Sequence, residues 1–248
     1  MKKPLRIILI IFCIILVGVS GYLFYKDLTY KDKIYEPALN DIKVDESEKT
    51  PVAIEHEVIK MSPDVDLAAQ RLYYNNNDII GRLEIPDLFN ILVVNGIDNK
   101  YYLNKDLYKK SNVKGNEFLD YRLKPDAKQV NIYGHNSRDP NVQVPFLRLE
   151  KYIDKDFFDN NPYIIWQYDG GKRIYKISVW KEIQTDREHM IVDTSGATFL
   201  GHVSKLLSNS TYIRSVPYDV NSNIIILQTC SHHLSNAFYL LIGIEIQP

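Results

Sequence analysis

The two residues best suited to covalent chemistry are Cys230 and His135. Cys230 follows the apolar run Ile224 to Leu227, which is typical of a buried strand, and a polar turn comes directly after it. A cysteine at the end of a strand is a candidate nucleophile, although many lone cysteines are simply small buried hydrophobic residues. The only other cysteine, Cys13, lies in an apolar N-terminal run, so a disulfide within the remaining chain is excluded.

His135 occupies a similar position. A strand-like run over residues 129–133 ends in Gly134 and then His135. Because a thiol at neutral pH is only a few per cent thiolate, a nucleophilic cysteine needs a base or a cation beside it. An imidazole can accept the thiol proton and later return it to a leaving amine. A histidine alone is more often a surface or structural residue, but a cysteine and a histidine that both end strands together predict a catalytic pair.

Composition and motifs exclude other kinds of site. Lys and Arg total 30 against 31 acidic residues, giving a net charge of -1 in 248 residues, so no basic excess favours a nucleic-acid partner. His232 and His233 are adjacent, and on a strand they would point to opposite faces. The remaining histidines have no spacing typical of metal ligands, and the chain has no glycine-rich phosphate loop. We therefore expect no metal and no other cofactor.

The N-terminal residues predict a membrane anchor. Residues 1–6 carry three basic side chains, and the run 7–24 that follows has no charge. As a helix this run would reach roughly 27 Å, enough for a thin or tilted span. A cleaved signal peptide is the alternative, but no clear small-x-small site follows. We expect a cytosolic N-terminus at 1–6, a signal-anchor at 7–25 and an extracellular remainder, that is, a single-pass protein of the cell membrane.

The rest of the chain is a polar stalk followed by a β-rich body. Residues 26–61 are charged and lack periodicity, so we expect a partly disordered or loosely helical stalk. Ser62 and Pro63 predict the start of a helix that ends at 75–78. Apolar residues at helical spacing predict two more helices, over 146–158 and 195–207. Short apolar runs predict strands over 79–85, 89–94, 118–121, 129–133, 163–168, 173–182, 223–229 and 237–246.

These elements predict a mainly β fold with helical additions. About eight strands with short turns favour a closed antiparallel barrel, preceded by one helix and with another helix before the cysteine strand. Five sequence blocks follow one another along it: 77–86, 99–103, 118–122, 133–136 and 227–230. In order and spacing they resemble the class B sortases of Gram-positive bacteria, from about residue 67 to 246. The resemblance implies that 62–248 is a sortase-like catalytic domain with an eight-stranded sortase-type β-barrel.

The resemblance also implies a function. Class B sortases are membrane-anchored cysteine transpeptidases that cleave a sorting motif near the C-terminus of a secreted protein. Cys230 would attack the scissile carbonyl to form a thioacyl-enzyme, and His135 would protonate the leaving amine. An amine from a peptidoglycan precursor or a pilin lysine would then resolve the intermediate, without a metal. Thr229 would help to shape the substrate groove.

One position departs from the family. The family carries an arginine on the strand after the cysteine, where it supports the substrate and the developing oxyanion, and this sequence places Phe238 there. Losing one oxyanion donor can cost on the order of 10²–10³ in rate. Candidates to replace it lie in the turn after Cys230, and alternation would put Asn236 on the strand face of Phe238. The residues considered are His232, His233 and Asn236, with Arg214 and Arg138 as weaker alternatives.

Three functions therefore remain open. The first is an active transpeptidase with a rearranged oxyanion site, which the presence of both Cys230 and His135 favours. The second is a degenerate sortase fold that acts as a surface binding module for a sorting-motif peptide or a pilus subunit, which Phe238 favours. The third is a cysteine hydrolase, which differs from the first only in using water as the acceptor.

Overall fold

The computed structural model describes residues 19–22, 49–54, 57–137, 139 and 142–246. The chain divides into two compact units, Met1–Glu36 and Pro37–Pro248. In the first unit only residues 19–22, which are helical, are described, so most of the expected anchor at 7–25 lies outside the described residues. Among the described residues no helix has the length and apolar character needed to span a bilayer. The expected single-pass membrane topology is therefore corrected: the structure does not support it.

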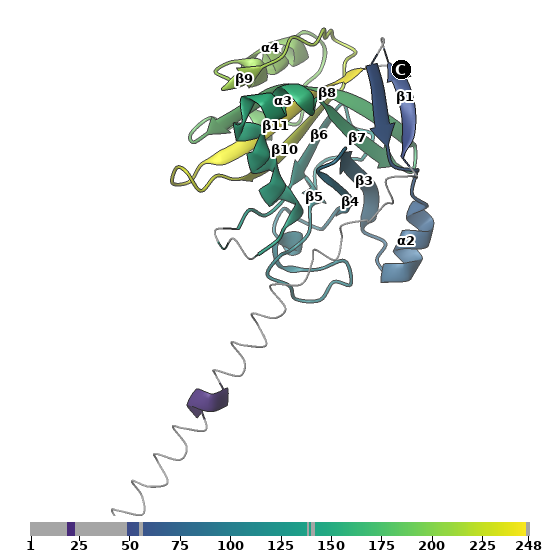
Figure 1. Cartoon of the computed structure of the whole chain (residues 1–248), viewed down its shortest axis with the longest axis vertical. Coiled ribbons are helices and arrows are strands. Elements are labelled where there is room, and N and C mark those ends of the chain that lie inside the picture. The colour runs from purple at the N-terminus through teal and green to yellow at the C-terminus, as the bar shows by residue number, and fades with distance from the viewer. Residues whose placement is uncertain (1–18, 23–48, 55–56, 138, 140–141, 247–248) are drawn as a thin grey trace, which may run out of the picture. The chain divides into compact units, whose positions relative to one another are not determined.

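The second unit is built from β-strands with short helices between them (Figure 1). Its strands are β1 Thr50–Ile54, β2 Glu57–Met61, β3 Ile79–Ile85, β4 Phe89–Val94, β5 Phe118–Leu119, β6 Gln129–Tyr133, β7 Tyr163–Tyr168, β8 Gly171–Ile183, β9 Tyr212–Ile213, β10 Ile224–Cys230 and β11 Phe238–Ile246. Its α-helices are α2 Leu67–Tyr74, α3 Lys155–Asn160 and α4 Gly196–Leu207, and its 3-10 helices are η2 Tyr101–Asn104, η3 Pro145–Ile153 and η4 Glu188–Met190.

Eight of these strands close into a barrel. Each strand is hydrogen-bonded to the next in the order β3, β4, β5, β6, β10, β11, β8, β7, and β7 pairs with β3 to complete the circle. β9 lies outside this circle, as an extra edge strand on β8. The expected eight-stranded barrel is confirmed. The expected antiparallel pairing is wrong at two places, because β4–β5 and β6–β10 are parallel.

Strand β10 is buried on both faces. Ile225 and Leu227 belong to the cluster that fills the barrel, whereas Ile224 and Ile226 lie outside it, in a second cluster with Phe199 of α4. α4 and β9 lie together on one side of the barrel in Figure 1. Two buried faces explain why the β10 sequence is a continuous apolar run instead of an alternating one. The expected helix before the cysteine strand is confirmed in α4.

The N-terminal side of the barrel differs from expectation. The helix predicted to start at Ser62 begins at Leu67, and its N-cap is Asp66, which accepts from the Ala69 N–H at 3.0 Å. Ser62 instead donates its hydroxyl and its backbone N–H to buried Glu84 at 2.7 and 3.0 Å. A serine before a proline satisfies an N-cap pattern, but the carboxylate of a distant strand competes successfully for the same groups.

Part of the expected stalk is structured. Strands β1 and β2 form an antiparallel hairpin inside the 26–61 segment. Ile59 and Met61 are buried against Tyr163, Ile165 and Ile174 of the barrel. The folded unit thus includes residues before position 62, because the apolar side chains of β2 complete a small cluster on the outside of β7 and β8.

Candidate active site

The parallel pair β6–β10 brings the two candidate catalytic residues to one end of the barrel. Gln129 lies opposite Ile224, and Tyr133 lies opposite Gln228. Hydrogen bonds continue past the end of β6, from Gly134 to the Gln228 carbonyl and from Asn136 to the Cys230 carbonyl, so the segment with His135 runs alongside Cys230. Cys230 ends β10 and alternates with residues that point into the barrel, so its side chain lies on the outer face. Two residues far apart in sequence are therefore neighbours at the ends of adjacent strands.

Two side chains clamp these strand ends together. The hydroxyl of Thr229 donates to the Gly134 carbonyl at 3.0 Å, and the Gly134 N–H donates to the Gln228 carbonyl at 3.1 Å. In the other direction, the amide of Asn136 donates to the Cys230 carbonyl at 2.8 Å. Each strand thus holds the backbone beside the catalytic candidate of the other strand. This reciprocal clamp fixes the spacing of Cys230 and His135 without using either side chain.

Gly134 allows the chain to turn at this point. A Cβ atom on Gly134 would lie 2.5 Å from the Phe146 ring, a distance that packed side chains do not tolerate. Phe146 belongs to η3 and is fully buried in the barrel core. The absence of a side chain at 134 therefore lets the segment that carries His135 lie directly on the core.

The His135 ring is held through one of its nitrogens. Nε2 lies 2.5 Å from the carbonyl of Leu103 in η2. Because a carbonyl oxygen only accepts, Nε2 carries a hydrogen and donates it, which leaves Nδ1 able to accept a proton. Fixing one nitrogen in this way sets both the tautomer and the orientation of the ring. Among the described residues no hydrogen bond joins the imidazole to the Cys230 sulfur.

A buried carboxylate supports the segment that carries Leu103. Asp120 is fully buried and accepts from Tyr133 at 2.9 Å, from Asn99 at 3.1 Å and from the Arg122 guanidinium at 2.6 Å. Burial alone would raise the pKa of Asp120, but these donors, led by Arg122, hold it below its ordinary value. Asp120 therefore stays ionised, and it ties β6 to the residues that precede η2.

The thiol of Cys230 is free and exposed. Desolvation by the protein around the sulfur raises its pKa above the ordinary value. The neutral thiol therefore dominates at pH 7, since burial penalises the thiolate. A reaction at this sulfur has to pass through a minor thiolate population or a coupled proton transfer.

The turn after Cys230 holds the other residues predicted from sequence. His233 is exposed, with Nδ1 at 3.1 Å from Glu182, and Ser231 also hydrogen-bonds to Glu182. Asn236 is exposed and has a left-handed backbone, with φ of 57°. Because β11 starts only at Phe238, the strand alternation expected for Asn236 does not apply. Thr229 is buried, and its hydroxyl is engaged in the clamp.

Phe238 is the direct cross-strand neighbour of Cys230. The arginine candidates considered from sequence do not lie beside it in the described structure. Arg214 donates to the carbonyls of Ile177 and Phe158 at 2.5 and 2.6 Å, and Arg138 lies outside the described residues. The guanidinium of Arg187 instead lies 5.3 Å from the centre of the Phe238 ring. Arg187 and the clamp residue Asn136 are site residues that the sequence does not predict. Arg187 lies outside every block of the resemblance, and Asn136, although inside the block 133–136, reaches Cys230 only through the strand pairing.

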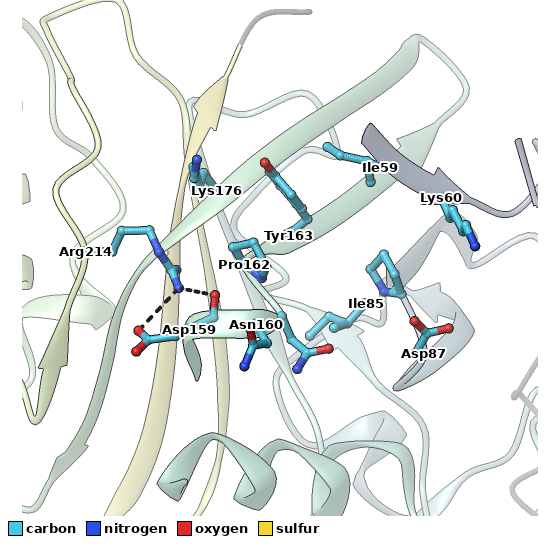
Figure 2. A pocket seen from close by; sticks show the side chains of 12 residues that line it. Ile59, Lys60, Ile85, Asp87, Asp159, Asn160, Pro162, Tyr163, Lys176 and Arg214 are labelled. Carbon is cyan, nitrogen blue, oxygen red and sulfur yellow. Dashed lines mark hydrogen bonds and ion pairs between the residues drawn. The ribbon is translucent and has the colours of Figure 1, made fainter. Parts of the chain in front are cut away.

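A hollow of about 640 Å³ lies elsewhere on the barrel (Figure 2). Its lining includes Lys60, Asp87, Lys176 and Arg214, and neither Cys230 nor His135 contributes to it. In Figure 2 Arg214 points toward Asp159, with a nitrogen 4.0 Å from the carboxylate. This hollow therefore offers side chains of both charges but neither of the two candidate catalytic residues. Within the described ranges no group of three His, Cys, Asp or Glu side chains is arranged to hold a metal.

His189 lies in η4, which is hydrogen-bonded to β6 through the Asn131 side chain. Its burial predicts a pH dependence of stability. It is 1% exposed, and burial lowers its pKa to about 4, with only partial opposition from Gln228. The unfolded chain, with a histidine pKa of about 6.5, binds the proton more readily than the folded chain. Stability is therefore complete above about pH 6.5 and is lost as the pH falls towards 4, by on the order of 3 kcal/mol.

Denaturant unfolding at pH 7, 5.5 and 4.5 measures this effect. His189→Leu is expected to flatten the profile over that range. It should change stability little at pH 7, because the ring is neutral there and makes at most one weak hydrogen bond, to the Gln228 side chain, among the described residues. An unchanged pH profile in His189→Leu would assign the acid sensitivity to other groups.

Comparisons with known proteins agree with this fold. No model of a protein family matches the chain. Sortase B of Staphylococcus aureus (strain NCTC 8325 / PS 47) is 26% identical over 161 residues, covering 62% of this chain and 64% of that relative, which is less than two thirds of its length.

Solved structures extend the match to the whole barrel. Sortase B of Listeria monocytogenes has a TM-score of 0.63 and 26% identity, covering 72% of this chain and 99% of that one. Sortase B of Clostridium perfringens has a TM-score of 0.65 and 24% identity, covering 72% and 100%.

The closed mixed barrel matches the fold of these sortases, and in this chain a histidine and a cysteine follow or end two neighbouring parallel strands. The matching relative and structures are sortases of class B, and α4 lies where the class B resemblance placed a helix. By sequence and by fold the chain is therefore similar to class B sortases.

Proposed function

We propose that the protein is a cysteine transpeptidase that cleaves a sorting motif and transfers the acyl fragment to an amine. The observation that carries the proposal is the in-register placement of Cys230 and His135, held by the Thr229–Asn136 clamp. Nucleophile and proton donor on adjacent strand ends suit a two-step acyl transfer. The 26% identity to S. aureus sortase B supports the same chemistry.

In the first step the Cys230 sulfur attacks the scissile carbonyl carbon. The thiol proton passes to Nδ1 of His135 as the sulfur–carbon bond forms, and His135 then gives that proton to the departing amine as the carbon–nitrogen bond breaks. The product is a thioester between Cys230 and the N-terminal fragment of the motif. Because Nε2 of His135 is engaged by Leu103, the ring is oriented before the substrate arrives, which removes an entropic cost from the step.

In the second step an amine attacks the thioester. The carbon–sulfur bond breaks, the thiolate leaves, and the proton released by the amine returns to the Cys–His pair. The acceptor classes that we propose are a peptidoglycan precursor and a pilin lysine. One structural relative is a Streptococcus pyogenes class B sortase involved in pilus biogenesis, and another is an S. aureus sortase B–substrate complex. Thr229, His233 and Asn236 remain proposed substrate-binding residues.

A second candidate function is a binding module without turnover. The observation that favours it is Phe238 directly opposite Cys230, where a phenyl ring provides neither charge nor hydrogen-bond donor. Such a protein would hold a sorting-motif peptide and form no covalent intermediate. The presence of a free, exposed thiol in register with His135 favours the enzyme.

The test is amine-dependent product formation. The purified full chain is incubated with a panel of sorting-motif peptides, with and without triglycine or a lysine-bearing peptide, and products are identified by mass spectrometry. A transpeptidase gives a thioester adduct and, with amine, a ligated product. Hydrolysed peptide alone would identify a hydrolase. Peptide binding by calorimetry with neither adduct nor product would identify a binding module.

A further inference from the structure

We propose that Arg187 supplies the cationic hydrogen-bond donor for the substrate carbonyl at Cys230, from a loop and not from the strand beside the nucleophile. This inference rests on the proposed function, since it concerns the oxyanion formed at the same sulfur. An acyl-transfer site needs a donor aimed at the oxygen on which charge develops. The cross-strand neighbour of Cys230, Phe238, cannot provide one.

Three adjacent strands place Phe238 beside Cys230 on the outer face of the barrel. β8, β11 and β10 are adjacent, and Ile183, Phe238 and Cys230 lie opposite one another in a single row. Ile183 belongs to the hydrophobic cluster on the outer face of the barrel, and Phe238 packs against that cluster. This is also the face of Cys230, since it alternates with inward-pointing Leu227. A group lying over Phe238 is thus on the same face as the nucleophile, over the strand that neighbours it.

Arg187 is that group. It follows the end of β8 by four positions, and its guanidinium carbon lies 5.3 Å from the Phe238 ring centre, within the range of a cation–π contact. Its Nη1 donates to the carbonyls of Gln184 and Asp186, at 2.9 and 2.8 Å. Among the described residues neither Nε nor Nη2 has a hydrogen-bond partner, and no carboxylate forms an ion pair with the guanidinium. The side chain is therefore held in place with donors still available.

The loop that carries Arg187 is anchored at both ends. On one side Gln184 donates to the Ser235 carbonyl at 2.9 Å, which ties the loop to the turn after Cys230. On the other side Asn131 donates to the His189 carbonyl at 2.7 Å, and Gln129 donates to the Ile191 carbonyl at 2.8 Å. Anchored donors need little reorganisation during the reaction, which is what makes oxyanion stabilisation effective. Phe238 is then a positioning residue: it orients Arg187 and does not touch the substrate carbonyl.

Five variants test this assignment: Arg187→Ala, Arg187→Lys, Phe238→Leu, Phe238→Arg and the double variant Arg187→Ala/Phe238→Arg. The measurements are the rate of thioester formation with a sorting-motif peptide, by intact mass, and the rate of iodoacetamide alkylation of Cys230. Arg187→Ala is expected to slow thioester formation about 10²–10³-fold. Arg187→Lys should lie in between, because an ammonium keeps the charge but not the planar donor pair.

Rescue separates a catalytic role from a structural one. Phe238→Arg places a guanidinium opposite Cys230, so the double variant is expected to recover at least tenfold over Arg187→Ala. Phe238→Leu keeps an apolar contact but removes the ring under Arg187, and it should slow thioester formation with little change in alkylation. A collapsed fold would be evident as a loss of alkylation selectivity and of cooperative unfolding.

Arg173 provides a matched control. Its guanidinium lies 5.5 Å from the Tyr168 ring centre and donates to the carbonyls of Ala127 and Asp126, both at 2.8 Å. It thus shares a ring contact and two carbonyl acceptors with Arg187, although it also lies 3.9 Å from Glu245, and it is near the start of β8 instead of beyond its end. Arg173→Ala is expected to leave thioester formation unchanged.

The two proposals fail in different ways. Thioester formation in the wild type with an equal rate in Arg187→Ala would overturn the role of Arg187 and leave the transpeptidase intact. No thioester in the wild type or in Phe238→Arg, with Cys230 still alkylated normally, would overturn the proposed function itself. A thioester that appears only in Phe238→Arg would also overturn the Arg187 assignment, because it would show that no donor operates in the natural site.

Discussion

Replacing Cys230 by alanine is expected to abolish thioester formation and amine transfer. Removing the nucleophile of an acyl-transfer enzyme costs on the order of 10⁶ in turnover, because the remaining groups cannot form the covalent intermediate. The fold should be unaffected, since Cys230 is exposed and its carbonyl, not its side chain, is held by Asn136. Intact mass after incubation with the peptide panel measures the adduct, and thermal unfolding measures the fold.

The only other cysteine supplies the control. Cys13→Ala should behave as wild type, and in that variant the adduct must map to Cys230. Alkylation adds a pH signature: because burial raises the pKa of the Cys230 thiol, the iodoacetamide rate should rise about tenfold per pH unit from pH 7 to pH 9. An adduct of equal size in Cys230→Ala would remove Cys230 from the mechanism.

The strands were predictable because their patterns are local. Four strands, β3, β4, β6 and β7, have the bounds predicted from sequence, and the apolar run of β10 correctly indicated a buried strand. The pairing of those strands is not local information. Nothing in residues 129–133 or 224–230 indicates that they lie parallel, yet this pairing is what brings His135 beside Cys230.

The supporting residues of the site were less predictable, for the same reason. Thr229 and Asn136 each form a hydrogen bond across the β6–β10 junction, and neither role is visible until the strands are paired. Ser62 has the sequence context of a helix cap, but it binds Glu84, which is 22 positions away in the chain. Short-range rules fail where a distant partner competes for the same donor.

Arg187 is the clearest example. It precedes Cys230 by 43 positions (230 minus 187), outside every motif that carries the family resemblance. Sequence comparison alone indicates a lost arginine at 238 and therefore favours a decayed enzyme. The structure supplies a guanidinium over the same ring, which favours an active one. A missing catalytic residue is thus weak evidence for lost activity until the surrounding loops have been placed.

Replacing His135 is expected to slow both chemical steps while leaving the thiol reactive. A positioned general acid contributes about 10²–10⁴ in rate, so the His135→Ala variant should lose transfer activity to that extent. Its Cys230 should still react with iodoacetamide at pH 9, where more of the thiol is ionised than at pH 7. Single-turnover measurement of thioester formation, alongside alkylation, separates the two effects.

His135→Gln distinguishes proton transfer from positioning. The glutamine amide carries an N–H that can donate to the Leu103 carbonyl, as Nε2 does, but it cannot exchange a proton at pH 7. If His135 acts as an acid, His135→Gln should be as slow as His135→Ala, and added imidazole should partly restore the alanine variant. A glutamine variant with wild-type rates would instead mean that His135 only anchors its segment to η2, and another group would have to protonate the leaving amine.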